Sequence, residues 1–246
     1  MRKNHFFSRL LALSMALLLL PACAANTDMT ITDQNGKEIE VSSAGNDTYT
    51  FKVPTSQPLA NGWDNPFIDV TEGTWYYEAV RYCYENGLMR GTTENTFCPN
   101  APTSRAMIVA ILWRLEGRPS AGRNTFRDVP EDQYYADAVA WAASQDIVSG
   151  FSDEIFAPGD AITKEQLAAI LYRYASCQNW DISHTQTLDA FADAHTASGY
   201  AEDALSWAAS HDIISGTEDR LLTPRGEATR AQVATILMNL CETIAE

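Results

Sequence analysis

The sequence predicts a mainly α-helical protein of three helix–loop–helix repeats, preceded by a short β-strand segment. Three observations predict it: a recurring spacing, two helical patterns in each repeat, and strand-like alternation near the N-terminus. In the recurring spacing a glycine is followed by Phe or Leu after six residues, Pro after eight and a cation after fourteen. The glycines are Gly91, Gly150 and Gly216, which lie 59 and 66 residues apart (150 − 91 and 216 − 150). Copies at a near-constant period predict stacked repeats.

The first 23 residues are typical of an exported chain. Three cations precede an apolar run of 11 residues, 10–20, which is too short to span a bilayer as a helix. Leu20-Pro21-Ala22-Cys23 is similar to a bacterial lipoprotein box and predicts a lipid on Cys23, whereas Ala22-Cys23-Ala24 also suits an ordinary signal peptidase. Both alternatives predict a signal peptide over residues 1–23.

Residues 24–65 predict a small β-rich spacer. The segments 29–32 and 38–41 flank Asn35-Gly36, a strong hairpin signal, and residues 48–53 alternate with period two. About three strands are too few to close a sandwich. The segment resembles the end of an Ig-like bacterial surface repeat.

The three repeats are predicted to occupy residues 66–120, 121–180 and 181–246. In each repeat the second helix is apolar on most faces and is therefore expected to be buried. One repeat alone has nothing to cover that surface, whereas three repeats around one axis do. The first helices are expected to end at a residue in the left-handed conformation. Their predicted ranges are about 75–86, 135–145 and 200–211, and the residues that end them are Gly87, Asp146 and Asp212.

The first residue of each second helix carries the functional prediction. A Ser or Thr suited to the N-cap is followed by Arg105, Lys164 or Arg230. A cation in the first turn opposes the helix dipole and costs about 0.3–1 kcal/mol. Beside the free N–H groups of a helix N-terminus, such a cation predicts a site for a carboxylate or phosphate. The alternative is a salt bridge to a carboxylate of a neighbouring repeat.

Aromatic pairs precede the first helices, and from them Trp75 and Tyr135 are taken as candidates for stacking on sugar rings. The alternative is that these side chains cover the core. Trp141 and Trp207 occupy matching helical positions and are expected in the core. A second recurring pair of cations, Arg114 and Arg173, is interpreted as lining a rim or packing.

Composition excludes several classes of function. Without residues 1–22 the chain has 14 Lys and Arg against 32 Asp and Glu, a net charge of −18 (14 − 32). Such an acidic body argues against nucleic acid or anionic lipid as its general partner. No cofactor or metal site is predicted, because the cysteines form no zinc pattern; Cys83 and Cys241 are expected to be core thiols.

No catalytic motif of a hydrolase, nucleotide-binding or metalloprotease type occurs, and the histidines after residue 23 do not recur between repeats. The chain is therefore predicted not to be an enzyme. Carboxylates are abundant, so a glycosidase pair is the alternative.

The repeated motifs resemble the S-layer homology family. The marks are the F-x-D-V start at 67–70, the G…F-x-P loop, and the T-R-A-E-like helix starts at 163–166 and 229–232. The resemblance implies a pseudo-threefold trimer of repeats within one chain. It implies grooves between repeats that bind secondary cell-wall polysaccharide, often with acidic pyruvyl-ketal sugars, with Arg105, Lys164 and Arg230 facing the carboxylate. Lys164 departs from the family's usual Arg and loses bidentate geometry.

The predicted function is therefore a non-catalytic anchor at the cell envelope, with cell-wall polysaccharide as partner and a lipid on Cys23 as a membrane tether. The alternative is a module that binds a protein or assembles with itself into a surface layer.

Overall fold

A computed structural model describes residues 63–183 and 187–244, together with strand residues 31–32, 38–39, 41–43 and 49–51. The predicted signal peptide and Cys23 lie outside the described residues. The chain divides into two compact units, one of residues 19–64 and one that includes residues 65–246.

The smaller unit contains two pairs of short antiparallel strands. Ile31 pairs with Ile39, which confirms the predicted hairpin, and Val41 pairs with Phe51. The segment 38–41, expected as one strand, is divided between the two pairs. The strands are β1 (Ile31–Thr32), β2 (Glu38–Ile39), β3 (Val41–Ser43) and β4 (Tyr49–Phe51).

The larger unit is helical, and each repeat contributes two α-helices, as predicted. Short 3₁₀ turns, η1 (Leu188–Ala190), η2 (Ala194–Thr196) and η3 (Gly199–Ala201), precede the first helix of the third repeat. The helices are α2 (Tyr77–Glu85), α3 (Arg105–Leu115), α4 (Ala136–Ser144), α5 (Lys164–Cys177), α6 (Glu202–Ser210) and α7 (Arg230–Ile244). No helix within residues 63–183 and 187–244 is both long and apolar enough to cross a membrane.

The helix ends follow from local sequence. Gly87, Asp146 and Asp212 have φ values of 67°, 55° and 55°, so the first helices end in the left-handed conformation as predicted. The Thr163 hydroxyl accepts from the N–H of Gln166, whose side chain accepts from the N–H of Thr163, and this capping box fixes the start of α5. The hydroxyls of Ser104 and Thr229 likewise accept from the third N–H of α3 and α7.

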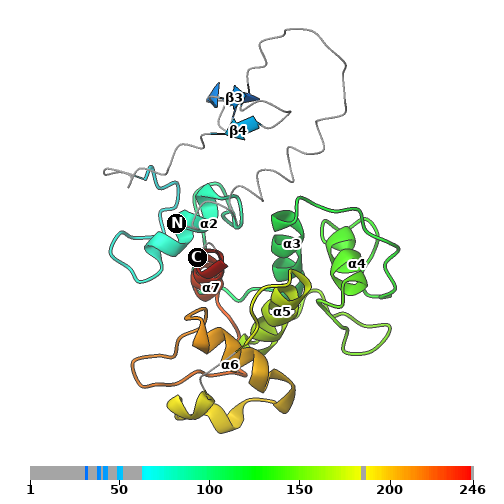
Figure 1. Ribbon diagram of the computed structural model, residues 1–246. Coiled ribbons are helices and arrows are strands. Elements are labelled where there is room, and N and C mark those ends of the chain that lie inside the picture. The colour runs from blue at the N-terminus through cyan, green and yellow to red at the C-terminus, as the bar shows by residue number, and fades with distance from the viewer. Residues whose placement is uncertain are drawn as a thin grey trace. The chain divides into compact units, whose positions relative to one another are not determined.

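The main packing partner of each helix comes from a neighbouring repeat. Figure 1 shows α3 beside α4, α5 beside α6, and the last helix, α7, beside the first, α2. The first and third repeats therefore close a ring. Trp141 on α4 and Trp207 on α6 are buried between such helices, which confirms their predicted place in the core.

A cycle of backbone hydrogen bonds marks the centre of the ring. The N–H of Thr103 donates to the carbonyl of Ala228 (3.0 Å), that of Ala228 to Ile162 (2.8 Å), and that of Ile162 to Thr103 (2.9 Å). The three residues hold the same place in their repeats and are fully buried. This cycle gives the larger unit the expected pseudo-threefold arrangement.

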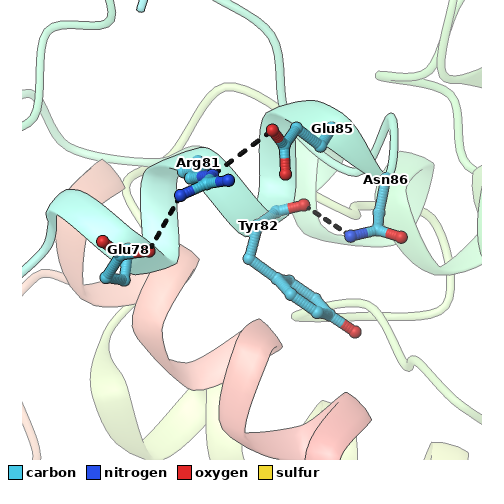
Figure 2. A network of polar contacts seen from close by, with 5 residues as sticks. All are labelled: Glu78, Arg81, Tyr82, Glu85 and Asn86. Atoms are coloured by element: carbon cyan, nitrogen blue, oxygen red, sulfur yellow. Dashed lines mark hydrogen bonds and ion pairs between the residues drawn. The ribbon is translucent and has the colours of Figure 1, made fainter. Parts of the chain in front are cut away.

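The two faces of α2 differ: one has ion pairs, and the other packs buried side chains against α7. On the outer side Arg81 lies between Glu78 (3.8 Å) and Glu85 (3.3 Å), as Figure 2 shows. The ring of Tyr82 points instead toward α7, and burial together with Cys241 raises the pKa of its hydroxyl. Cys83 donates to the carbonyl of Ala234 on α7 (3.4 Å). Cys83 and Cys241 are buried free thiols, as predicted.

Candidate functional site: a groove between repeats

One carboxylate in each repeat holds the loop that faces the preceding repeat. Asp69 accepts from the N–H groups of Phe97 (2.8 Å) and Cys98 (2.7 Å). Asp128 holds Phe156 and Ala157, and Asp193 holds Leu222 and Thr223, in the same way. Cys98, Ala157 and Thr223 have positive φ, so these bonds stabilise a conformation that such residues seldom adopt. For Asp193, burial opposes ionisation, but the N–H bonds outweigh it and lower its pKa.

The shared glycine gives room for the shared phenylalanine. A Cβ on Gly91 would lie 2.6 Å from Cε1 of Phe67, and one on Gly150 would lie 2.7 Å from Cε1 of Phe126. Gly216 and Phe191 repeat the contact at 2.8 Å. The recurring Gly and Phe are thus two halves of one packing contact.

The N-termini of the second helices are already occupied. The N–H of Arg105 donates to the carbonyl of Asp160 (3.0 Å) and that of Ala106 to Pro158 (3.1 Å), both in the loop of the second repeat. The equivalent N–H groups of α5 and α7 donate to Gly226 and Pro224, and to Ala101 and Pro99. The expectation that free N–H groups would bind an anion is therefore wrong, because the next repeat's loop satisfies them.

The three cations also reach into the next repeat. Arg105 donates through Nε to the carbonyl of Phe156 (3.0 Å) and through Nη2 to Ser149 (3.3 Å). Arg230 makes the same pair of bonds to Phe97 (2.7 Å) and Arg90 (2.6 Å). Lys164 donates to the carbonyl of Leu222 (3.3 Å) and to the hydroxyl of Thr223. Each cation therefore links its own helix to the loop of the following repeat.

These cations form no salt bridge to a carboxylate within the described part of the chain, so the alternative expected from the sequence is not realised there. Arg105 and Arg230 are 6% and 7% exposed, and each guanidinium lies over a phenylalanine ring, 4.8 Å from Phe156 and 4.4 Å from Phe97. Burial lowers the pKa of both arginines. Their charge is left without a bonded carboxylate.

A cleft of about 250 Å³ is lined mainly by the first repeat, together with Arg230 of the third repeat and Tyr134 of the second, and we call it the first groove. Its polar lining is Arg90, Arg114, Arg230, Thr103 and Tyr134, and no carboxylate lines it. Arg114 donates to the carbonyls of Ala110 (3.0 Å) and Leu88 (3.4 Å). Its pKa is lowered by burial and by nearby Arg90. The remaining lining residues are Leu88, Met89, Gly91, Met107, Ala110 and Ile111.

Of the three arginines in the first groove, the sequence singled out Arg230 for binding and Arg114 for a rim or packing, but missed Arg90. Arg114 recurs as Arg173 and its assignment to a rim agrees with its place here, but Arg90 lies in a loop whose equivalent residues are Ser149 and Ser215. A search for recurring residues cannot find a side chain that does not recur. The detectable signal was a lone cation immediately before the shared glycine.

An exposed aromatic side chain precedes the first helix of each repeat. Trp75, Tyr134 and Tyr200 each lie two residues before a first helix and are 66%, 65% and 56% exposed. Tyr134, rather than Tyr135, is therefore the counterpart of Trp75. Tyr135 is half-buried and packs edge-on against Tyr134, with the ring centroids 5.0 Å apart.

The model of the S-layer homology domain matches residues 66–106, 125–168 and 190–234. The chain belongs to the S-layer homology domain family. The matched segments agree with the three repeats, and each includes the F-x-D start and the cation of the second helix.

Relatives with this domain are larger proteins. The chain is 28% identical over 192 residues to an endoglucanase of Bacillus sp. (strain KSM-635), which covers 78% of this chain and 20% of the relative. It is 28% identical over 170 residues to the surface-layer 125 kDa protein of Lysinibacillus sphaericus (68% and 14%). It is 26% identical over 159 residues to a cellulosome-anchoring protein of Acetivibrio thermocellus (61% and 34%). The chain spans about a third or less of these proteins.

Proposed function

We propose that this S-layer homology chain is a non-catalytic anchoring module that binds anionic, pyruvylated-type secondary cell-wall polysaccharide between its repeats. The observation that carries the proposal is the first groove, which is lined by three arginines and by no carboxylate in a chain of net charge −15. Guanidinium groups bind carboxylates with charge-assisted hydrogen bonds, which are about twice as strong as neutral ones.

The repeats would contribute cations and aromatic rings to the polymer. Arg230, Arg105 and Lys164 supply positive charge at the interfaces between repeats. Trp75 and Tyr134 supply exposed faces on which a sugar ring can stack. Tyr135 supports Tyr134 from the side. Several weak contacts along one polymer add up to tight attachment, because each further contact is intramolecular.

The family and its relatives support a place at the cell surface. S-layer homology repeats occur in a surface-layer protein and in a cellulosome-anchoring protein. The relatives named as enzymes match this chain over a small part of their length, so those names describe proteins with much additional sequence. Export through the signal peptide, and a membrane tether through a lipid on Cys23, complete the proposal.

A pull-down with purified cell-wall sacculi tests the anchoring role. The chain should bind native sacculi and lose most of its binding once the secondary polysaccharide has been chemically stripped. Tyr134→Ala should weaken binding about tenfold, the equivalent of about 1.4 kcal/mol, because the exposed ring at the first groove is lost.

Ile68→Ala is the matched control, because Ile68 is 78% exposed and does not line the first groove. It should bind as the unmodified chain does. Equal binding to native and stripped sacculi would reject a polysaccharide ligand and favour a protein partner. Release of reducing sugar from the purified polymer would reject the non-catalytic role.

A further inference from the structure

The pseudo-threefold arrangement creates three equivalent interfaces between repeats, but the chain equips them differently. We infer that the first groove is the chain's single dedicated anion site, that Arg90 and Thr103 determine its specificity, and that Glu165 closes the second interface from within. The inference rests on the proposed function only for the origin of the anion in a wall polymer.

The positive charge falls from one interface to the next. The first groove has three cations, the second interface two and the third interface one. At the third interface, Asn239 takes the place of Arg114, and its amide donates to the carbonyls of Asp212 (3.1 Å) and Ile213 (3.4 Å). The equivalent residues are Arg90, Arg114 and Arg230 in the first groove, Ser149, Arg173 and Arg105 at the second interface, and Ser215, Asn239 and Lys164 at the third interface.

The second interface already contains a carboxylate of the chain itself. Glu165 is 6% exposed and accepts from the N–H and the hydroxyl of Ser198 (both 2.9 Å). It also accepts from the hydroxyl of Tyr200 (3.3 Å), and burial together with this carboxylate raises the pKa of Tyr200 to about 12. Glu165 thus forms a hydrogen bond with the aromatic residue of this interface, Tyr200. It also places a negative charge at an interface that has two cations.

The first groove has no such internal carboxylate. Ala106 stands at the position of Glu165, as does Ala231 in the third repeat. A carboxylate or phosphate is therefore attracted to the first groove, whose lining contains no carboxylate, and repelled at the second interface by Glu165.

The Thr103 hydroxyl is an independent sign of a ligand. It lines the first groove, is fully buried and, within the described residues, is the one buried side-chain polar atom without a hydrogen-bond partner. The equivalent residues, Ile162 and Ala228, carry no polar group. An unpaired buried hydroxyl destabilises a fold, so a group retained in this state is explained when it donates to a bound anion.

The floor of the groove defines the rest of the ligand. Met107, Ala110 and Ile111 line it beside the arginines. The residues equivalent to Met107 are Gln166 and Gln232, whose amides fold back to cap their own helices. The ligand that fits is therefore a carboxylate or phosphate carried on an apolar or sugar framework, with an oxygen that reaches Thr103.

Titration of the full chain with pyruvate and, separately, inorganic phosphate tests the inference, observed through the Nε–H signals of arginine in NMR spectra. Signals of Arg114 and Arg230 should shift and those of Arg105 should not. Arg90→Ser, which copies the other two repeats, should weaken binding about tenfold. Thr103→Val should raise the melting temperature, since it removes an unpaired hydroxyl, yet weaken binding severalfold. The arm that binds more tightly identifies a carboxylate or a phosphate ligand.

Arg127→Ala is the matched control, because Arg127 is an exposed arginine paired with Glu154 (3.3 Å) and lies outside the first groove. It should bind both anions as the unmodified chain does. Unchanged affinity in both Arg90→Ser and Thr103→Val would overturn the inference, as would an equal shift of the Arg105 signal.

The two proposals fail in different ways. If the small anions bind with this pattern while sacculi do not bind, the anchoring role is rejected and the anion site stands. If sacculi bind and the affinity for them is the same in Arg90→Ser and Thr103→Val, the anchoring role stands and the assignment of these two residues is rejected.

Discussion

The first residue of each second helix is a cation because it bonds to the loop of the next repeat. The cation does not stabilise its own helix. Arg105 and Arg230 each donate to two carbonyls of the next repeat's loop, and those bonds offset the unfavourable interaction with the helix dipole. A planar guanidinium with separate Nε and Nη donors suits two carbonyls at once. The proposed function therefore combines a structural role and a role in binding in one side chain.

Lys164 is the weak member of this set, and its replacement is predicted to be stabilising. In Lys164→Arg the guanidinium should bond Leu222 through Nε and reach the carbonyl of Ser215, which is equivalent to the carbonyls of Ser149 and Arg90. One added hydrogen bond should raise the free energy of unfolding by about 1 kcal/mol, measured by urea denaturation.

Lys164→Met is the companion variant, because it keeps most of the length and removes the donor. It should lower the free energy of unfolding by about 1–2 kcal/mol. If Lys164→Arg were as unstable as Lys164→Met, the equivalence of the three cations would be wrong.

The sequence identified these residues but not their partners. Capping and dipole arguments depend on neighbours along the chain, so they singled out Arg105, Lys164 and Arg230. The partners are backbone carbonyls 44 to 140 residues away, and no side-chain pattern reports a carbonyl. Glu165 was missed for a related reason, because its contacts with Ser198 and Tyr200 exist only after the repeats have assembled.

At the scale of the element, each repeat is organised by its loop. The loop packs the shared Phe against the shared Gly and is held by the shared Asp, while its carbonyls accept from the helix and the cation of the preceding repeat. The loop is thus the part of each repeat that recognises its neighbour. This explains why the recurring motifs gather around it.

Two of the three shared glycines, Gly150 and Gly216, are predicted to differ in how well they tolerate an added Cβ. In Gly150→Ala the new Cβ would lie 2.3 Å from the carbonyl oxygen of Ser152 and 2.4 Å from that of Ile155, so backbone must move. Gly216→Ala meets mainly the ring of Phe191, at 2.8 Å, which can shift. We expect losses of about 3 kcal/mol and about 1 kcal/mol in urea denaturation.

Gly159→Ala serves as the control, because nothing lies within 4 Å of its added Cβ. It should leave the free energy of unfolding unchanged within about 0.5 kcal/mol. Equal losses in Gly150→Ala and Gly216→Ala would show that the loop, rather than the close contact, sets the cost.

Much of the element scale was predictable. Helix number, the capping of the second helices and the left-handed ends at Gly87, Asp146 and Asp212 all follow from local rules, and the structure confirms them. Apolar periodicity shows which face of a helix is buried but not which helix covers it. The pairing of α3 with α4, rather than with its own repeat's α2, therefore appears only in the structure.

At the scale of the molecule, the ring makes the three repeats depend on one another. Removal of the third repeat would expose the side of α2 that contacts α7, including Cys83, and would break the cycle through Ala228. We predict that a chain ending at residue 180 has lost its cooperative thermal unfolding transition, measured by circular dichroism.

A chain lacking residues 1–64 is the matched truncation, because it removes sequence of similar length and leaves every repeat intact. It should retain a single cooperative transition. A stable, cooperative fold in the chain that ends at residue 180 would show that the repeats fold independently of ring closure.

The closure between α7 and α2 also fixes where the chain would yield under tension. The repeats enter and leave the ring at the same junction, so a force pulling the two ends apart is applied there first. The first groove lies across that junction, with Arg230 on one side and Arg90 and Arg114 on the other. A polymer bound in the groove would contact both sides of the junction and oppose its separation. Binding would therefore stabilise the protein at the place where the force acts first.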